Sequence, residues 1–569
     1  MLVETSGFDD FGGWVLDTQF YQQMGGHFLL AHGMGKPVAN AKTTFTLPKA
    51  GTWRVWVRTR DWCPGDWEAP GKFKVKVNGE TLAPVFGTET GWAWQTGGTI
   101  EAASAGKHTL ELEDLTGFDG RCDAVFFTLE EKPELPNDDL VELAAWKDRL
   151  TGRAKLEIEE GAYDLVIVGG GMTGCGAALA ARKHGLVVAL VQDRPLFGGN
   201  ASEEIRVHTL GIHGKSADII KQIDTDHYPN GDEKAKVDQR RREKVLMESG
   251  ADLFPGHDAI GLGMDGERIT SVEAREVRSG KIRRFRAPVF IDATGDGWIG
   301  AWAGAEFREG RESKHEFDEG WDRYGELWSP EKPDKRVLGT SVLWNSEKAT
   351  TASTFPEVPW AMPVAKDHEA INGEWYWEYS NNQLDQVKDA EQIRDHVLRA
   401  IFGSFANAKR HPKHATVKLK WVAYVGGKRE SRRLVGDYIY TMKDATERRK
   451  FPDTVVEEKR ELDGHYQLVE TGSPYDFLSK AMFLKLGGDI YEMPFRCFYS
   501  RNIENLMMAG RCFSCSHVGL SGPRVMNTCA QMGVATGFAA VVCKKHGVLP
   551  REAGKKHIHE LRQMIGYEA

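Results

Sequence analysis

The segment YDLVIVGGGMTGCGAALAARKHG at residues 163–185 constrains the fold more than any other part of the chain. A continuous apolar run leads into Gly169, Gly171 and Gly174 in G-x-G-x-x-G spacing, and an Ala-rich stretch follows. We predict a buried strand, a tight turn at Gly169 and a helix, with Gly171 admitting a pyrophosphate and Gly174 allowing helix–strand packing. The N-terminus of such a helix offers unpaired N–H groups and a positive dipole end to a diphosphate. The segment therefore predicts a Rossmann-like dinucleotide-binding unit.

A second glycine triplet shows that this spacing is informative only in its structural context. Gly261, Gly263 and Gly266 repeat the spacing, but they lie in a strand-like run that an Asp-Gly turn follows, with no helical pattern after it. We therefore predict that this triplet binds no nucleotide. Without a second dinucleotide site for NAD(P)H, we expect electrons to come directly from the substrate.

The next strand should supply the group that binds a ribose. VVALVQD (187–193) has the pattern of this strand, whose end normally carries a carboxylate for the adenosine ribose. Here the position falls on Gln192, with Asp193 beside it, and either side chain can bind a ribose hydroxyl. Further on, Gly199 and Asn200 lie in a segment where paired glycines permit a close backbone approach to the ligand.

Two further strand-to-turn segments complete a pattern typical of FAD binding. VFIDATGDGWIG (289–300) is one, and the region 502–543 is the other, with a long helix expected to begin between Pro523 and Asn527. Either segment alone is ordinary in an α/β core, but three nucleotide signals in this order predict FAD. The remaining expected cofactor contacts are Arg206, Ala259, Thr294, Gly295, Asp296, Gly510, Arg511, Asn527 and Thr528.

Three segments give the chain a specific resemblance to a known family. GGNAS (198–202), GKRESRRLVGDY (427–438) and the pattern AGRC…H…RVM…TC (509–529) resemble the bacterial FAD-dependent oxidoreductases of the glutathione-reductase-like, two-dinucleotide-fold superfamily. The resemblance covers residues 161–569 and implies a bound FAD. Members often carry a β-sandwich similar to a carbohydrate-binding module. Many members have Asp after the final Ala-Gly to hold the ribityl chain, whereas this sequence has Arg511.

The length of the chain and its changing pattern predict several domains. Short alternating runs such as TWRVWVRTR (52–60), broken by Gly, Pro and Asn-Gly turn signals, predict an all-β sandwich. We expect this sandwich to precede an α/β, Rossmann-like FAD-binding domain that is interrupted by an inserted α+β substrate or cap domain. Because all three nucleotide signals lie beyond residue 160, we expect FAD binding not to need the sandwich. The expected bounds are 1–130 for the carbohydrate-binding-module-like sandwich, 131–160 for a linker with a short helix, 161–304 and 494–569 for the FAD-binding domain, and 305–493 for the cap domain.

Charge and hydropathy narrow the range of partners. The net charge of −8 gives no basic footprint, which argues against nucleic acid. We expect no apolar stretch to reach the ~20 residues of a membrane span, and the first residues lack a secretory signal. We expect a cytoplasmic protein, or an extracytoplasmic one if a signal was removed ahead of this sequence. We predict no metal site and consider a polysaccharide contact through residues 1–130.

The turn between the last strand and the last helix should bring catalytic groups to the flavin. Hydride transfer from an alcohol needs a base for the hydroxyl proton, and neutral His suits this role at pH 7. We predict His517, in that turn, as the general base, with His213 and His208 as alternatives. Arg524 and Arg429 are expected to orient substrate oxygens or to balance charge on the reduced flavin, with structural ion pairs as the alternative.

These features together predict an FAD-dependent oxidoreductase that passes a hydride between the flavin and a small organic substrate, above all a carbohydrate or polyol-type alcohol. The sugar assignment rests on the sandwich and on aromatic runs such as WYWEYS (375–380) in the cap domain. Cys512 and Cys515, beside the expected flavin, leave open a flavin-linked thiol-disulfide oxidoreductase. A non-catalytic carbohydrate-binding protein is the second alternative.

Overall fold

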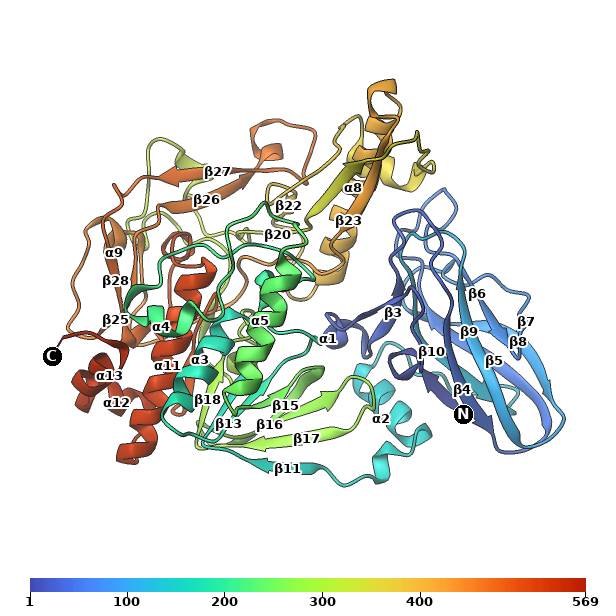
Figure 1. Ribbon diagram of the computed structural model, residues 1–569, viewed down its shortest axis with the longest axis horizontal. Coiled ribbons are helices and arrows are strands. Elements are labelled where there is room, and N and C mark those ends of the chain that lie inside the picture. Colours follow the sequence, from blue (N-terminus) through green and yellow to red (C-terminus); the bar gives the residue numbers. More distant parts are fainter. Residues whose placement is uncertain (569) are drawn as a thin grey trace.

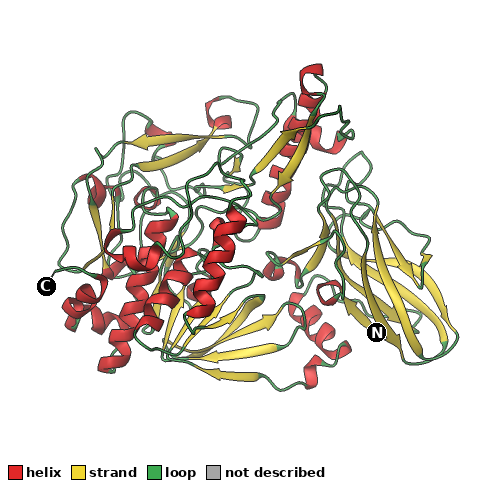
Figure 2. Cartoon of the chain, viewed as in Figure 1, coloured by secondary structure: helices red, strands yellow, loops and turns green. Residues whose placement is uncertain are grey.

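The N-terminal part of the protein is an antiparallel β-sandwich, as predicted (Figure 1, Figure 2). The computed structural model describes residues 1–568. One sheet has the order β2-β3-β10-β5-β8, with β1 against β10, and the other has the order β4-β9-β6-β7. Buried and exposed residues alternate along β4 because every second side chain points between the sheets. The strands are β1 Leu2–Glu4, β2 Val15–Asp17, β3 Phe28–Ala31, β4 Ala41–Leu47, β5 Gly51–Thr59, β6 Phe73–Val77, β7 Glu80–Thr81, β8 Ala93–Ala102, β9 Gly106–Asp114 and β10 Gly120–Thr128.

Two helices lie between the sandwich and the rest of the chain. α1 (Tyr21–Met24) projects from the sandwich toward the centre of the molecule (Figure 1). α2 (Leu140–Leu150) begins after Asp139, whose side chain accepts hydrogen bonds from the N–H groups of Val141 and Glu142. This cap satisfies two of the N–H groups that a helix start leaves without partners.

A five-stranded parallel sheet forms the centre of the second unit. Its order is β14-β13-β12-β18-β29. β12 (Leu165–Val168) pairs with β13 on one side and β18 on the other, and all its residues are buried. Because the strands are parallel, the segments that follow them meet at one edge of the sheet. The other strands are β13 Val188–Val191, β14 Asp252–Phe254, β18 Val289–Asp292 and β29 Leu506–Met508.

Two helices of small residues cross closely beside this sheet, α3 (Met172–Lys183) and α11 (Met526–His546) (Figure 1). A Cβ atom on Gly533 of α11 would lie 2.0 Å from the carbonyl oxygen of Thr173, and one on Gly537 would lie 2.4 Å from that of Ala177. The glycines therefore allow direct backbone contact between the helices. α11 begins within the predicted interval.

α11 also has the length and composition of a membrane-spanning helix. The expectation that no apolar stretch reaches this length is therefore wrong. Of its most apolar 18 residues, 89% are buried inside the protein, so the helix packs as part of the core.

A second sheet, of order β11-β17-β16-β15, lies below the parallel sheet in Figure 1. Gly261 and Gly263 lie in β15, and Gly266 lies in the turn that leads to β16. No helix follows this triplet, which confirms the interpretation of the second glycine motif as a hairpin. The strands are β11 Glu159–Ala162, β15 His257–Asp265, β16 Arg268–Glu276 and β17 Ile282–Arg286.

The inserted region contains five two-stranded sheets and one long helix, α8 (Ala390–Lys409). The pairs are β19 Phe307–Arg308 with β24 Arg433–Leu434, β20 Thr340–Ser341 with β22 Glu378–Tyr379, β21 Trp344–Lys348 with β23 Val417–Val422, β25 Thr454–Glu458 with β28 Tyr491–Pro494, and β26 Leu462–Gln467 with β27 Ser479–Leu484. The remaining α-helices are α4 Ala217–Ile220, α5 Ala235–Glu248, α6 Trp298–Trp302, α7 Met362–Ala365, α9 Met442–Thr446, α10 His517–Leu520, α12 Pro550–Lys556 and α13 Ile558–Ile565.

Buried ion pairs join the sandwich to the inserted region. The guanidinium of Arg121 on β10 is fully buried and binds Glu391 and Asp395 of α8, at 2.6 Å each. Arg394 of α8 pairs with Asp17 of β2 at 3.0 Å. Because charges at this depth are tolerated only when paired, these contacts define a specific interface between the two units.

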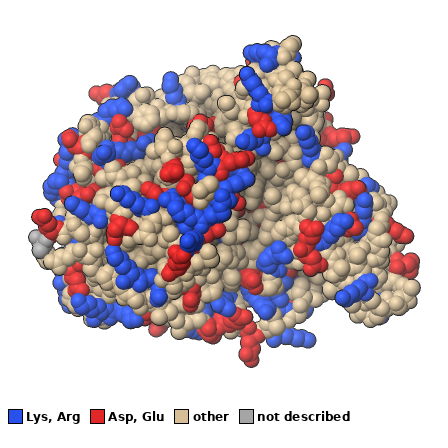
Figure 3. Space-filling model, in the orientation of Figure 1, with Lys and Arg blue, Asp and Glu red and all other residues tan. Residues whose placement is uncertain are grey.

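Basic and acidic side chains intermix on the surface, with basic groups gathered near the middle of the face in Figure 3, where α5 lies in Figure 1. Two basic side chains of α5 are paired with acidic residues of the same helix. Arg241 binds Asp238 at 2.9 Å, and Lys244 lies 3.7 Å from Glu248.

Candidate active site

Two cavities meet beyond the carboxyl ends of the parallel strands. The first, of about 240 Å³, is lined by the ends of β12, β13 and β18, the start of α3, and residues 18–23 of the sandwich. The second, of about 260 Å³, is lined by the segment after β13 and by the β26–β27 hairpin. Residues that line both cavities are Asn200, Lys428, Arg511, Arg524 and Met526. Ligands in the two cavities would therefore lie against each other.

The glycine turn has the geometry that a dinucleotide site requires. Gly169 has φ +104°, and a Cβ there would lie 2.3 Å from the carbonyl oxygen of Ala293. A Cβ on Gly174 would lie 1.9 Å from the carbonyl oxygen of Gly169, so Gly174 serves helix–strand packing rather than the cavity wall. At Gly171, a Cβ would find only the Cα of Gly199, at 3.9 Å. Gly171 thus leaves open the space into which a diphosphate would fit.

Gln192 and Asp193 both line the first cavity, but their hydrogen bonds differ. Gln192 Oε1 accepts from the Gly170 N–H at 2.6 Å, and its Nε2 donates to the Leu196 carbonyl at 3.3 Å. Its amide therefore holds the glycine turn. Asp193 accepts one bond from the Arg194 N–H through Oδ1. Asp193 is the better placed of the two to bind a ribose hydroxyl.

A compact charged group lies at the junction of the cavities. Asp296 accepts from Lys428 Nζ at 2.6 Å and from the Ser431 hydroxyl at 2.7 Å, and it lies 3.6 Å from Arg511. Although burial raises the pKa of Asp296, Lys428 and Arg511 outweigh it and hold the pKa at about 2. Arg511 Nη1 is buried and has no hydrogen-bond partner within residues 1–568, which leaves a donor for a bound ligand.

Most of the predicted cofactor contacts line the first cavity. These are Gly169, Gly171, Gln192, Asp193, Gly199, Asn200, Ala259, Thr294, Gly295, Asp296, Gly510 and Arg511.

Three other predicted contacts lie outside both linings. The Arg206 guanidinium stacks 4.4 Å from the Trp421 ring centre. The Thr528 hydroxyl donates to Glu458, and Asn527 Nδ2 donates to the Gly211 carbonyl at 3.2 Å. These three side chains thus have partners within the protein, and the residues of α11 that line the first cavity are Met526 and Cys529.

The sandwich contributes a wall that the sequence did not indicate. Gln22 on α1 donates to the Ala259 carbonyl at 3.0 Å, and Gln19 Oε1 accepts from the Gly426 N–H at 3.0 Å. Both glutamines line the first cavity. The sandwich therefore forms part of the wall of the cavity that most of the predicted FAD contacts line. A four-residue helix has no nucleotide signature that a sequence pattern could reveal.

Of the three histidines considered as bases, only His208 lines a cavity. Its ring packs 4.2 Å from that of His227, and Nδ1 is buried with no hydrogen-bond partner within residues 1–568. Burial, with a smaller contribution from His227, lowers the pKa of His208. The ring is therefore neutral at pH 7 and can accept a proton.

His517 and His213 are held by carboxylates away from both cavities. His517 is buried, and its Nδ1 lies 2.8 Å from Glu430. Its backbone N–H donates to Glu312 at 2.8 Å. His213 Nε2 lies 2.8 Å from Asp224. These placements favour a structural role for His517 over the predicted role of base.

A buried chain of alternating basic and acidic side chains forms one side of the second cavity. Arg429 lies 3.3 Å from Glu378, and Glu378 lies 2.6 Å from His465 Nδ1. On its other side, His465 Nε2 lies 3.4 Å from Asp463, which also lies 3.4 Å from Arg524. His465 was not predicted, because DGHYQ is an ordinary hairpin strand and its carboxylate partner Glu378 lies far away in sequence.

The burial of the cysteines argues against thiol-disulfide chemistry. All eight are free and buried. Burial raises the pKa of Cys512 and Cys515 well above that of an ordinary thiol, and neither lines a cavity. Since the thiolate is the reactive form, both groups are poor nucleophiles.

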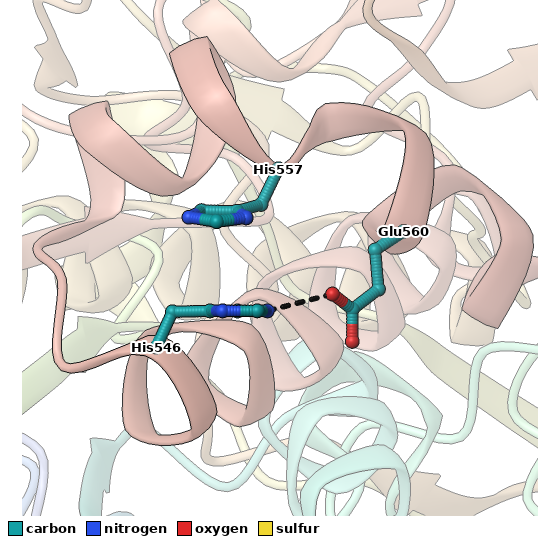
Figure 4. A group of neighbouring side chains, drawn as sticks. All are labelled: His546, His557 and Glu560. Carbon is teal, nitrogen blue, oxygen red and sulfur yellow. Dashed lines mark hydrogen bonds and ion pairs between the residues drawn. The ribbon is translucent and has the colours of Figure 1, made fainter.

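One group of metal-ligating side chains is found at the C-terminal helices: His546, His557 and Glu560 (Figure 4). The two imidazole rings stack 3.8 Å apart at 12°, and Glu560 is already paired with His546 and Lys545. Lone pairs of stacked rings point in parallel directions, so the two rings do not converge on one ion.

Comparison with known proteins gives one family match. The family described as FAD dependent oxidoreductase matches residues 164–565. A 40-residue segment is 48% identical to a soluble pyridine nucleotide transhydrogenase of Marinobacter nauticus, covering 7% of this chain and only 9% of that protein. A geranylgeranyl bacteriochlorophyll reductase-like protein from Thermoplasma acidophilum is 14% identical over 71% of this chain and 84% of that one, with a TM-score of 0.33. A family 35 carbohydrate binding module from an environmental isolate is 20% identical over 24% of this chain and 98% of that one, with a TM-score of 0.19.

Proposed function

The chain belongs to the FAD-dependent oxidoreductase family, and from that premise we propose that it passes a hydride between FAD in the first cavity and a carbohydrate or polyol-type alcohol in the second. The observation that carries this proposal is that the two cavities share lining residues, among them Asn200, Lys428 and Arg511. A cofactor in one cavity and a substrate in the other would therefore lie within reach of each other. From the segments that carry the resemblance, we further infer membership of the glutathione-reductase-like group.

We propose that this chain's own residues hold FAD through the glycine turn and the first turn of α3. The open space at Gly171 fits a diphosphate, and Asp193 offers a carboxylate to a ribose. Arg511 offers its unpaired donor where the two cavities join. Bound FAD supplies a two-electron acceptor for a hydride.

His208 is proposed as the group that takes the hydroxyl proton. Oxidation of an alcohol removes a hydride from carbon and a proton from oxygen, which leaves a carbonyl group. His208 is neutral and lines the substrate cavity, whereas His517 and His213 are bound to carboxylates. Arg429 and Arg524 line the same cavity and would orient substrate oxygens.

The lining of the second cavity supports a substrate with both apolar and polar faces. Trp375, Tyr376 and Phe483 supply apolar surface, and Asn230 and Glu374 supply polar groups. Ligand sites of this mixed kind suit a sugar ring, whose C–H face packs on aromatic side chains while its hydroxyls bind polar ones.

An absorption spectrum and an anaerobic reduction assay test this function. The purified protein should be yellow and should release FAD on denaturation. Mixed anaerobically with a panel of sugars and polyols, it should lose its flavin absorbance, and NADH or NADPH should leave that absorbance unchanged. A colourless protein that does not bind added FAD would contradict the proposal, and rapid bleaching by NADH would favour a reductase.

A further inference from the structure

We propose that the substrate binds in the second cavity through a carboxylate, so that the alcohol is a hydroxy acid or sugar acid rather than a neutral sugar. This inference rests on the proposed function, because it assigns a substrate class to the same cavity. It depends on the balance of charges around that cavity.

Cations outnumber the buried carboxylates that can neutralise them. Each such carboxylate is shared between at least two basic groups. Asp463 lies 3.1 Å from Arg460 and 3.4 Å from Arg524. Asp296 serves both Lys428 and Arg511, as described above, and Glu378 serves Arg429 and His465. Five Arg and Lys side chains of the lining, together with His465, thus face three buried carboxylates. The other acidic residue of the lining, Glu374, is exposed to solvent.

The excess charge is accompanied by unused hydrogen-bond donors. Nε of Arg460, Nε of Arg524 and Nη1 of Arg511 are buried without partners within residues 1–568. Burial lowers the pKa of Arg524, and it lowers that of Arg429 to about 10 although Glu378 opposes it. Guanidinium groups that are this incompletely compensated by the protein are stabilised when an anion binds beside them.

The residue types of the lining favour a carboxylate over a phosphate. Phosphate sites are commonly built from glycine-rich backbone and hydroxyl side chains. The second cavity has no Gly, Ser or Thr among its lining residues. Four of its donor side chains are guanidinium groups, whose planar forks match a planar carboxylate. Arg429 is preorganised for this role, since it donates to the Ser341 hydroxyl at 2.7 Å and stacks 4.3 Å from the Trp375 ring centre.

Matched alcohol pairs test the inference on the FAD-bound protein. Glucose is compared with gluconate and glucuronate, and glycerol is compared with glycerate. Glucose 6-phosphate tests whether the cavity prefers a phosphate. Anaerobic flavin reduction and flavin spectral shifts are both recorded, so that binding is seen even where no reduction occurs. At least one carboxylate should bind on the order of 10- to 100-fold more tightly than its neutral partner.

Substitutions separate a substrate-binding role from a cofactor-balancing role. Arg460→Gln should raise the KM or Kd for the acid on the order of 10- to 100-fold, with unchanged FAD content because Arg460 lines only the second cavity. Arg240→Gln, at an exposed position on α5, is the control and should change neither. Equal binding of acid and neutral alcohol, or preference for glucose 6-phosphate, would overturn the carboxylate assignment while leaving the oxidoreductase intact. A carboxylate that binds tightly without reducing the flavin would support the anion site and contradict the proposed oxidation.

Discussion

At the scale of single residues, three buried histidines differ in what holds their rings. His517 is bound to Glu430, and His465 lies between Glu378 and Asp463. The ring of His208 has an unpartnered nitrogen and lines the second cavity. The sequence could place His517 close to the last Ala-Gly turn, but it could not show the direction of the ring. That direction depends on Glu430, which is distant in sequence.

Replacement of His208 by Gln should slow substrate-driven flavin reduction by ~10²–10⁴, the usual effect of losing a positioned base. FAD content should stay unchanged, because His208 lines only the second cavity. Stopped-flow reduction, normalised to bound FAD, measures the effect. A rate equal to that of the wild type would exclude His208 as the base.

The pH dependence of kcat/KM should report the same group. Burial lowers the pKa of His208, so its neutral, proton-accepting form persists to lower pH than for a free histidine. Activity should therefore be lost as pH falls through this lowered pKa and should be level near neutrality. His208→Gln should abolish this acidic limb. A limb centred above pH 7 in the wild type would point to a different base.

His517→Ala should affect stability instead of chemistry. It leaves the buried Glu430 carboxylate without one of its partners, which costs about 1–3 kcal/mol of the free energy of unfolding. The melting temperature should fall, while the reduction rate per bound FAD stays at the wild-type value. If the rate per FAD instead fell by orders of magnitude at unchanged stability, the original assignment of His517 as the base would be restored.

At the scale of elements, the long and regular pieces were the predictable ones. The β12–α3 unit, the start of α11 and the hairpin nature of the second glycine triplet all follow from local pattern, and the structure confirms them. The inserted region could not be predicted in this way. Several of its strands have only two residues, such as β20 (Thr340–Ser341) and β22 (Glu378–Tyr379), too short for any periodicity to appear.

Alanine substitutions in the two glycine triplets should have three different outcomes. Gly171→Ala meets little resistance in the protein, so the fold should persist, but the methyl group occupies the space of the diphosphate and FAD should be lost. Gly174→Ala collides with the Gly169 carbonyl and should lower the melting temperature as well. Gly261→Ala, which meets no atom within 4 Å, is the control. Circular dichroism melting and FAD content distinguish them, and full FAD occupancy in Gly171→Ala would refute the assigned diphosphate position.

At the scale of the whole molecule, the sandwich forms part of the wall of the first cavity. The sequence predicted that residues 1–130 form a separate module, because their turn-rich alternating pattern ends well before the first nucleotide signal. The contacts that contradict this separation are made by single side chains such as Arg121 and Gln22, and each has its partner hundreds of residues away. Long-range contacts of this kind leave no local pattern in a sequence.

Removal of residues 1–130 should therefore release FAD. The deletion opens the wall formed by residues 18–23 and leaves Glu391, Asp395 and Arg394 without their partners from the sandwich. Loss of a partner from a buried ion pair costs about 3–5 kcal/mol. The truncated protein should purify colourless or with low FAD occupancy.

A point variant makes the same test without deleting a domain. Arg121→Met removes the cation that binds Glu391 and Asp395 but leaves the hydrophobic core of the sandwich unchanged. FAD fluorescence should then appear at a lower temperature than in the wild type, because the interface that holds the cavity wall is weakened. Lys107→Met, at an exposed position on β9, is the matched control and should melt like the wild type. If the truncated protein kept its FAD and Arg121→Met released it at the wild-type temperature, the sandwich would be an independent module, and the cofactor site would be complete without it.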